Sequence, residues 1–402
     1  MTGPTRVLSL YEGFFAGGAR ILHTDVAAGL HASRGERGGQ QHSVLSIASS
    51  ARRESTLQSM EHDPRYLRLI REGVSVSTLG RTAGEMPLEA STFTDLELRV
   101  AAEAIGQADV ILSLKEQPLG LLLALRDRGF MPDVPVAACL HRSDPTHSGP
   151  ALGWLSEATA TGLVTATISC AWTTSAAYER ATPGVEARYV IPNGIDTTRF
   201  RPGTPREVRA ARARLGAAAA SAVVVFAARF DAMKDPGLFF RAVAAHARHR
   251  PDTHYLVCGA GMVRGNEALR AMLDESGVPT HANVHLLGIR DDMPLIYRTA
   301  DIVALTSAFG EASPLCLIEG AASGATPVTT NVGDSAREVD GFGLVTAHDP
   351  EEIASAWEHV LTRRSAFRDA AIAARPRLGR ERMLDDYRAA MDDLLVTRRI
   401  AA

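Results

Sequence analysis

Lysine is nearly absent from this chain. Lys115 and Lys234 are its only lysines, although 43 of its 402 residues are basic. Such a preference for arginine is typical of a GC-rich genome. Because so few lysines remain, each one is a stronger candidate for a specific role than a lysine would ordinarily be.

The sequence also lacks a large net charge and long apolar runs. The formal net charge is −3 at pH 7, so bulk charge gives no reason to expect nucleic-acid binding. No apolar run reaches the roughly 20 residues of a membrane-spanning helix. The opening MTGPTRVLSLYEGFF has too short a charged head and apolar core for a signal peptide. We therefore expect a cytoplasmic protein without an integral membrane segment; peripheral membrane contact through a local patch stays open.

Cysteine is scarce and dispersed. The four cysteines lie far apart in apolar contexts and form no CxxC motif, which favours buried, reduced thiols. No cluster of His, Asp or Glu has the spacing of metal ligands, so we expect no metal site.

The length and the pattern of apolar segments predict the fold class. A chain of 402 residues suits two domains of about 200 residues each. Short apolar strands alternate with helices throughout, which is typical of an α/β protein with parallel sheets. The stretch from Ala51 to Arg99 is polar and broken by Gly and Pro, and we expect it to contain a surface excursion and a helix over Ser91–Gln107.

The segment Asp301–Asp334 is the most informative part of the sequence for both the fold and the expected ligand. Ile302–Leu305 reads as a buried strand and Pro327–Thr330 as a second one. Between them, Pro314 suits the first turn of a helix, and the helix ends near Gly324.

Two carboxylates, Glu311 and Glu319, flank the start of this predicted helix. The backbone N–H groups of Ser313 and Leu315 lie between them, and a helix N-terminus attracts phosphate. Carboxylates accept hydrogen bonds from sugar and ribose hydroxyls. The combination predicts a ligand with hydroxyl groups on both sides of a diphosphate, which describes a nucleotide sugar.

The surrounding string FGEASPLCLIEGAASGATPVTT resembles the donor-binding motif of the retaining GT-B glycosyltransferases of the large family four. That motif reads roughly E-G-F-P-x-x-x-x-E-A-x-A-x-G-x-P-V; here Ala312 and Ser313 replace the usual Gly-Phe. The resemblance implies an α/β protein of GT-B architecture, with two Rossmann-like parallel-sheet domains that face each other across a cleft.

Two cations follow the apolar strand SAVVVFAA. Arg229 and Lys234 are separated by a turn, and at the end of a strand they can neutralise a diphosphate. They match the family's G-R-L-x-x-x-K-G pattern, with Ala228 in place of the first Gly. The resemblance further implies donor contacts at Gly17, Gly18, Gly259, Ile289, Arg290, Ser313, Pro314, Leu315 and Glu319.

The string RYVIPNGIDTTRFRP resembles the family's crossing between domains. We therefore expect an acceptor-binding domain over residues 1–195 and a donor-binding domain over residues 196–382. In the resembling family the last helix, here about residues 383–402, packs back on the first domain.

In the first domain, candidate residues follow strand ends, where parallel sheets bind their ligands. His141 follows one strand, and the resemblance implies that it contacts the transferred sugar. Lys115 and Glu116 follow another strand, and with Asp144 they are candidates for acceptor binding.

The expected function is retaining, metal-independent transfer of a sugar from a nucleotide diphosphate to a small-molecule, lipid or saccharide acceptor. The donor is a substrate and no separate cofactor is expected; UDP is favoured, with GDP and ADP open. His141, Arg229, Lys234 and Glu311 are the catalytic candidates, and we expect a monomer or homodimer.

Three alternatives stay open at this point. A catalytically silent nucleotide-sugar-binding protein and a GT-B sugar-nucleotide epimerase share the fold. A NAD-dependent dehydrogenase is less favoured because no G-x-G-x-x-G follows the first strand.

Overall fold

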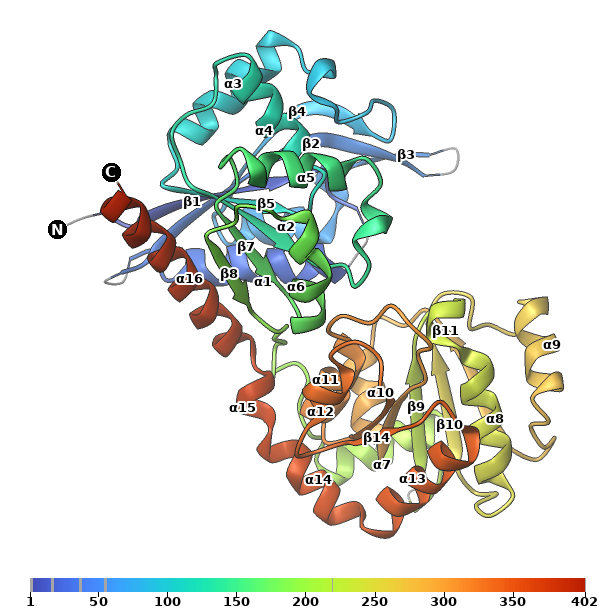
Figure 1. Ribbon diagram of the computed structural model, residues 1–402. Helices are drawn as coiled ribbons and strands as arrows, with labels where there is room; N and C mark the ends of the chain where they lie inside the picture. The colour runs from blue at the N-terminus through green and yellow to red at the C-terminus, as the bar shows by residue number, and fades with distance from the viewer. Residues whose placement is uncertain (1–2, 16–17, 36–37, 54–55, 219, 402) are drawn as a thin grey trace. The chain divides into compact units, whose positions relative to one another are not determined.

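The computed structural model describes residues 3–15, 18–35, 38–53, 56–218 and 220–401 (Figure 1). The chain forms two compact units. Unit 1 comprises Met1–Pro192 and Met383–Ala402, and unit 2 comprises Asn193–Arg382. Each unit is an α/β body built on its own sheet.

Unit 1 contains an eight-stranded sheet in the order β3-β2-β1-β5-β6-β7-β8, with β4 also paired to β2. Except for the antiparallel pair of β2 with β3, the strands of this sheet are parallel. The first half of the unit holds β1 Thr5–Tyr11, α1 Gly18–Ala32, β2 Gln40–Arg53, β3 Thr56–Ser59, η1 Met60–His62, α2 Pro64–Arg71, β4 Ser75–Ala83, η2 Ala90–Thr92 and α3 Asp95–Gly106. The second half holds β5 Val110–Leu114, α4 Leu119–Asp127, β6 Val136–Leu140, η3 Pro145–Ser148, α5 Ala151–Ala160, β7 Ala166–Ser169, α6 Trp172–Tyr178, η4 Glu179–Ala181 and β8 Ala187–Val190.

The central strands of unit 1 are buried on both faces of the sheet, to which their successive side chains point in turn. In β1, Leu8 and Leu10 join the core cluster formed with α3, α4 and α5, whereas Tyr11 joins the cluster formed with α1 and α2. Helices on both faces account for the continuous apolar runs of these strands.

The stretch from Ala51 to Arg99 contains more regular structure than the helix that we expected. Besides the start of α3, the elements β3, α2 and β4 lie in it, and β4 pairs with β2. Most side chains of β4 are exposed or half-buried, so the strand lacks the apolar run that marks the central strands. The helix expected over Ser91–Gln107 divides into η2 and α3, and Thr94 caps α3 with a capping box to Glu97.

Unit 2 contains a six-stranded parallel sheet in the order β11-β10-β9-β12-β13-β14. Its elements begin with α7 Pro205–Arg214, β9 Val223–Ala227, η5 Ala232–Lys234, α8 Pro236–Ala247, β10 His254–Cys258, α9 Glu267–Glu275, β11 Asn283–Gly288, α10 Met293–Thr299 and β12 Ile302–Leu305. They continue with α11 Leu315–Ala322, β13 Thr326–Thr330, α12 Ser335–Val339, β14 Leu344–Thr346, α13 Pro350–Thr362, α14 Arg364–Ala373 and α15 Arg375–Leu378. The last helix, α16 Arg380–Ala401, begins at the end of unit 2, and its residues from Met383 on belong to unit 1.

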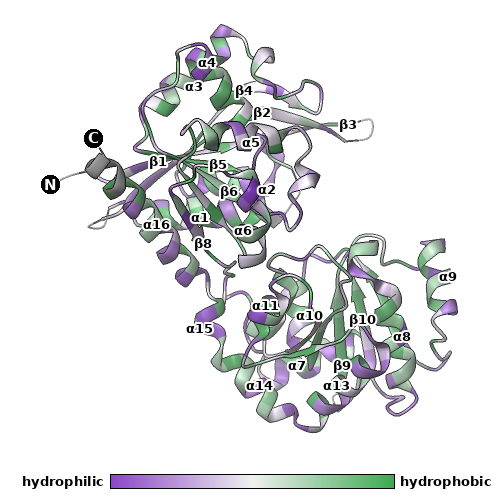
Figure 2. Cartoon of the chain, in the orientation of Figure 1, coloured by the Kyte–Doolittle hydropathy of each residue, from purple (hydrophilic) through white to green (hydrophobic). Residues whose placement is uncertain are grey.

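The central strands of unit 2 are apolar (Figure 2) and are also buried on both faces. Along β9, Val223 and Val225 contribute to the core shared with α10 and α11. Val224 and Phe226 contribute to the opposite core, shared with α8 and α13. The apolar central strands and the polar loops after them place polar side chains at the carboxyl edge of the sheet.

Helix α16 closes unit 1 with residues from the end of the chain. The ring of Tyr387 lies 6.5 Å from that of His23 on α1, edge to face. A Cβ on Gly29 would come within 2.6 Å of Leu384, so the glycine lets α16 lie close to α1. The Tyr189 hydroxyl donates a hydrogen bond of 2.5 Å to Asp393.

Candidate functional site

The candidate site residues of unit 2 gather at one edge of its parallel sheet. Arg229 follows β9, Gly259 follows β10, Ile289 follows β11, and the loop with Glu311 follows β12. Because these strands are neighbours and parallel, their carboxyl ends share an edge. In open α/β sheets this edge is where ligands bind.

Lys234 and Glu311 form an ion pair at this edge. The Lys234 Nζ lies 2.5 Å from the Glu311 Oε1, and the side chains are only 15% and 5% exposed. The Ser307 hydroxyl donates a hydrogen bond to the same carboxylate oxygen. The carboxylate is thus held in place although it lies out of bulk water, where an unpaired charge would be costly.

Local hydrogen bonds hold Lys234 and the loop of Glu311 together. The Asp231 carboxylate accepts the N–H of Met233 at 2.8 Å and so starts the short turn η5. The Thr306 hydroxyl lies 3.2 Å from the carbonyl oxygen of Lys234, and the Ala308 N–H donates to the carbonyl of Met233 at 2.9 Å. The turn after β9 and the loop after β12 therefore form one assembly.

Two glycines allow close backbone contacts at this edge. Gly259 has φ +136°, and a Cβ there would lie 2.0 Å from the carbonyl oxygen of Ala228. Gly333 has φ +60°, and a Cβ there would lie 2.0 Å from the carbonyl oxygen of Glu311. The loop after β13 thereby lies directly against the backbone of Glu311.

The start of α11 lies between polar groups from three segments. Pro314 is at the N-cap position and Leu315 is the first helical residue. The Leu317 N–H donates to the Pro314 carbonyl at 3.2 Å, so the N–H groups of Leu315 and Cys316 are the ones that precede the hydrogen bonds of the helix. Just before it, the Ser313 carbonyl accepts a hydrogen bond from Asn193 Nδ2 at 3.0 Å, and the Ser313 hydroxyl donates to Glu338. This geometry fixes the direction in which the helix presents its N-terminus.

Two carboxyls near α11 hold their protons more tightly than usual. Burial raises the pKa of Glu319 to about 7, although the Tyr297 hydroxyl and the charge of Arg199 act in the other direction. Burial raises the pKa of Glu338 to about 8, and Asp334 and Glu311 add to that effect. Glu319 is therefore partly neutral near pH 7, a state in which a carboxyl both donates and accepts hydrogen bonds.

Arg229 and Arg290 face solvent more than Lys234 does. The Arg229 side chain is 58% exposed and donates to Asp231 at 2.8 Å. Arg290 makes two hydrogen bonds to Asp292, at 2.8 and 2.7 Å. Ile289 is 80% exposed, so its backbone is accessible at the sheet edge.

In unit 1, His141 follows β6 with a buried ring nitrogen. Its Nε2 has no hydrogen-bond partner among the described residues. Burial lowers its pKa to about 3, with His23 and Lys115 contributing in the same direction, so the imidazole is neutral at pH 7. A neutral imidazole suits hydrogen bonding to an uncharged hydroxyl.

The other candidates in unit 1 differ in what the structure shows around them. Lys115 has φ 67°, an uncommon backbone conformation for a residue with a Cβ, and its pKa is lowered by burial and then by Arg20 and Arg142. Glu116 is fully buried and accepts a hydrogen bond from Tyr178. Both of these neighbours follow β5, yet only Lys115 retains some exposure.

Asp144 and the Gly17–Gly18 pair complete the predicted set. The Asp144 carboxylate accepts the N–H of Thr146 at 2.9 Å and so starts η3. Gly18 is the exposed first residue of α1, whereas Gly17 lies outside the described residues. The roles of these residues toward a ligand stay predictions.

The sequence did not predict that Glu338, Ser307 and Asn193 belong to this site. Ser313 and Glu338 are 25 residues apart, and no spacing or motif connects them. Asn193 lies in the PNG string that we assigned to the domain crossing, so its hydrogen bond to Ser313 could not be read from that pattern.

The described part of the chain contains neither a metal-ligand group nor a membrane-spanning helix. Within it, no group of three or more His, Cys, Asp or Glu side chains is placed to hold a metal ion. None of its helices is long and apolar enough to cross a membrane.

Comparison with known proteins shows what unit 2 is similar to. Residues 221–363 match the family described as glycosyl transferases group 1. The D-inositol 3-phosphate glycosyltransferase of Corynebacterium jeikeium is 31% identical over 175 residues, 42% of this chain and 42% of that protein. The protein of the same name from Saccharomonospora viridis is 33% identical over 224 residues, 51% of each chain. The chain thus spans about half the length of the curated relatives it matches.

Solved structures show the fold over the whole chain. Anabaena HepE in complex with UDP superposes with a TM-score of 0.76 at 19% identity, over 97% of this chain and 100% of that one. Sucrose-phosphate synthase from Thermosynechococcus elongatus gives a TM-score of 0.68 at 17% identity, with full coverage of both chains. The expected α/β class and GT-B architecture with two Rossmann-like units are confirmed at the level of the fold.

Proposed function

We propose that this chain, whose residues 221–363 carry the domain of the glycosyl transferases group 1 family, is a retaining glycosyltransferase that uses a nucleotide diphosphate sugar. The observation that carries the proposal is the Lys234–Glu311 pair at the carboxyl edge of the unit 2 sheet, beside the start of α11. UDP is the favoured nucleotide, and Anabaena HepE, of like fold, has been solved with UDP and with UDP-glucose.

Each part of this edge suits one part of such a donor. The Lys234 ammonium and the N-terminus of α11 would hold the diphosphate, with Arg229 at the exposed side. The Glu311 carboxylate would accept hydrogen bonds from sugar hydroxyls, and Glu319 from the ribose. His141, the neutral imidazole of unit 1, would contact the transferred sugar.

The proposed reaction is front-face transfer with retention. As the bond between the anomeric carbon and the phosphate oxygen breaks, the leaving phosphate oxygen takes the proton of the acceptor hydroxyl, and that hydroxyl oxygen bonds to the same face of the sugar. Lys234, Arg229 and the N-terminus of α11 stabilise the charge of the leaving diphosphate. We propose that no metal ion is needed for this step, and that unit 1 selects the acceptor.

Lys234 provides the direct test. Lys234→Ala should weaken UDP binding by about 1.5–3 kcal/mol, the range for hydrogen bonds to charged groups. Isothermal titration calorimetry measures this change, with Arg270→Ala on α9 as a control for the loss of an exposed cation. Since Lys234→Ala also leaves Glu311 unpaired, Lys234→Met combined with Glu311→Gln removes both charges. Unchanged UDP affinity in folded forms of both variants would refute the assignment.

The two open alternatives are separated by the products formed from UDP-glucose. A transferase without acceptor should slowly release UDP and free glucose. An epimerase keeps its product attached to the nucleotide, and a silent binding protein binds UDP-glucose and leaves it intact. Chromatography of the nucleotide and sugar products distinguishes the three. The cytoplasmic location and the monomeric or dimeric state stay predictions.

A further inference from the structure

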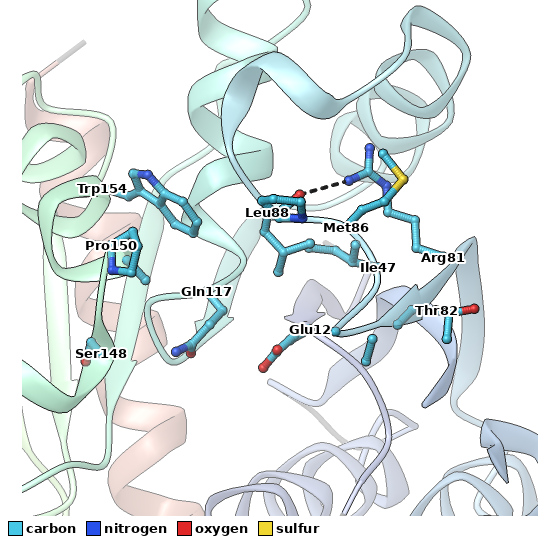
Figure 3. Close-up of a pocket in the computed structure, with 15 residues that line it drawn as sticks. Glu12, Ile47, Arg81, Thr82, Met86, Leu88, Gln117, Ser148, Pro150 and Trp154 are labelled. Carbon is cyan, nitrogen blue, oxygen red and sulfur yellow. Dashed lines mark hydrogen bonds between the residues drawn. The ribbon is translucent and has the colours of Figure 1, made fainter. Parts of the chain in front are cut away.

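Unit 1 contains a pocket that none of the predicted site residues lines. It has a volume of about 210 Å³ and lies beyond the carboxyl ends of β1 and β5, beside Ile47 and Ala48 in the middle of β2 and beside the last residues of β4 (Figure 3). In Figure 3, Trp154 and Pro150 stand on one side and Leu88, Met86 and Ile47 on the other. Its walls are therefore mainly apolar, and an apolar cavity of only about 150 Å³ already holds a benzene molecule.

The apolar wall depends on a glycine in α4. A Cβ on Gly120 would lie 1.7 Å from the carbonyl oxygen of Leu88 and 3.4 Å from the Trp154 ring. The absence of a side chain lets the segment of Leu88 and the indole of Trp154 pack on the same turn of the helix. The wall is thus built by tertiary packing between three segments distant in sequence.

The polar end of the pocket contains two side chains with oxygens that accept hydrogen bonds. Glu12 follows β1, and its carboxylate, 28% exposed, accepts a hydrogen bond from Arg20 at 3.2 Å. Gln117 follows β5, and its Oε1 has no hydrogen-bond partner among the described residues. Figure 3 shows both side chains directed toward the space between the apolar walls. Hydroxyl or amine groups of a ligand would satisfy these oxygens.

The pocket offers no free cation. Arg81 is the single Lys or Arg among the described residues that line it. Its guanidinium donates to both carboxylate oxygens of Glu97, at 2.5 and 2.9 Å, and to the Thr92 carbonyl at 2.7 Å. It also stacks on Phe93, with its Cζ 3.9 Å from the ring centre. Because these contacts engage the Arg81 guanidinium within unit 1, it is not available to bind a phosphate group in the pocket.

We propose that this pocket binds the apolar body of the acceptor. The acceptor is a neutral or cationic molecule with an aromatic or alicyclic group that fits between Trp154 and Leu88, and with hydroxyl or amine donors for Glu12 and Gln117. The lining thereby disfavours a phosphorylated polyol, the acceptor named for the D-inositol 3-phosphate relatives. The inference rests on the proposed glycosyltransferase function and specifies its acceptor class.

Three probes of defined chemistry test the proposal in the full-length protein saturated with UDP. Phenyl β-D-glucopyranoside and methyl β-D-glucopyranoside carry the same hydroxyls and differ in the apolar group, and D-inositol 3-phosphate supplies the anionic case. Calorimetry should give a dissociation constant for the phenyl glucoside about ten-fold or more below that of the methyl glucoside, because the phenyl ring leaves water. D-Inositol 3-phosphate should bind no better than the methyl glucoside.

Substitutions in the lining test whether this pocket causes the preference for the phenyl glucoside. Trp154→Ala and Leu88→Asp should each remove most of the phenyl preference while UDP affinity stays as in the wild type. Trp172→Ala is the matched control, since Trp172 is a 44% exposed tryptophan of the same unit outside the pocket lining.

A phenyl preference that survives in both pocket variants would overturn the proposal. Equal binding of the two glucosides, or tighter binding of D-inositol 3-phosphate, would also overturn it. UDP affinity is measured first, and failure to bind UDP would instead refute the proposed function.

Discussion

Glu311 and Glu319 lie within eight residues of each other but in different surroundings. Glu311 forms an ion pair with Lys234, whereas burial raises the pKa of Glu319 to about 7. This difference in surroundings supports the proposal of different roles toward a donor, with Glu311 near the reacting sugar and Glu319 at the ribose.

We expect replacement of Glu311 and of Glu319 to change different kinetic parameters. Glu311→Ala removes a negative charge that stabilises the positive anomeric carbon of the transition state, so kcat should fall by about 100-fold. Glu319→Ala removes an interaction that is alike in ground and transition states, so the donor KM should rise by about ten-fold. Steady-state kinetics with varied donor measures both, using variants that melt close to the wild type. The opposite pattern would exchange the proposed positions of sugar and ribose.

Glu338 makes stability depend on pH. Its pKa is about 8 in the folded protein and near 4.5 when unfolded, so between these values the folded state holds a proton that the unfolded state has lost. The free energy of unfolding should therefore fall as pH rises through this window, by at most about 1.4 kcal/mol per pH unit for this group. Glu338→Gln keeps an oxygen that accepts from Ser313 but carries no titratable proton.

Urea unfolding at pH 5.5, 6.5 and 7.5 tests this effect, because the wild type should lose stability with rising pH more steeply than Glu338→Gln. The comparison between the two proteins removes the contributions of other titrating groups. Parallel pH profiles would show that Glu338 does not hold its proton in the folded state.

At the level of elements, the loop after β13 supports the loop of Glu311. Gly333→Ala should destabilise unit 2 and weaken UDP binding, since its Cβ would meet the Glu311 carbonyl. Gly341→Ala is a matched control, because Gly341 also has a positive φ, +81°, but has open space around it. The control should show only the backbone penalty of about 1 kcal/mol. Thermal unfolding and UDP titration give both quantities, and equal effects in the two variants would contradict this support.

The sequence predicted best those elements whose residues are apolar throughout. β12 has the expected bounds, Ile302–Leu305, because a strand buried on both faces forms an unbroken apolar run. β4 was missed because it lies at the margin of its sheet and most of its side chains are half-buried or exposed. Local pattern carries little information about such a strand, whose position depends on its partner β2.

The candidate site was predicted in part for a similar reason. Lys234 and Glu311 stand in motifs with recognisable spacing, and the structure joins them in one ion pair. The pocket of unit 1 draws on Glu12, Leu88, Gln117 and Trp154, which come from four separate stretches of the chain. Only tertiary packing brings such residues together, so no local motif marks them.

For the whole molecule, the proposed mechanism predicts activity without added metal. In that mechanism, Lys234, Arg229 and the N-terminus of α11 supply the positive charge for the leaving diphosphate, so activity should survive EDTA. Product formation from UDP-glucose and an accepted acceptor, before and after chelation and dialysis, measures this. Loss of activity that magnesium or manganese restores would refute metal independence.

The return of α16 to unit 1 has a consequence for biosynthesis. Unit 2, Asn193–Arg382, is continuous in sequence, whereas unit 1 needs Met383–Ala402 to be complete. On a ribosome, which adds about 5–20 residues per second, the partners of His23 and Gly29 are made after the whole of unit 2. Unit 1, whose synthesis starts before that of unit 2, therefore completes its fold only after unit 2 has been made. Until residues 383–401 leave the ribosome, the surface of α1 that packs against α16 stays exposed.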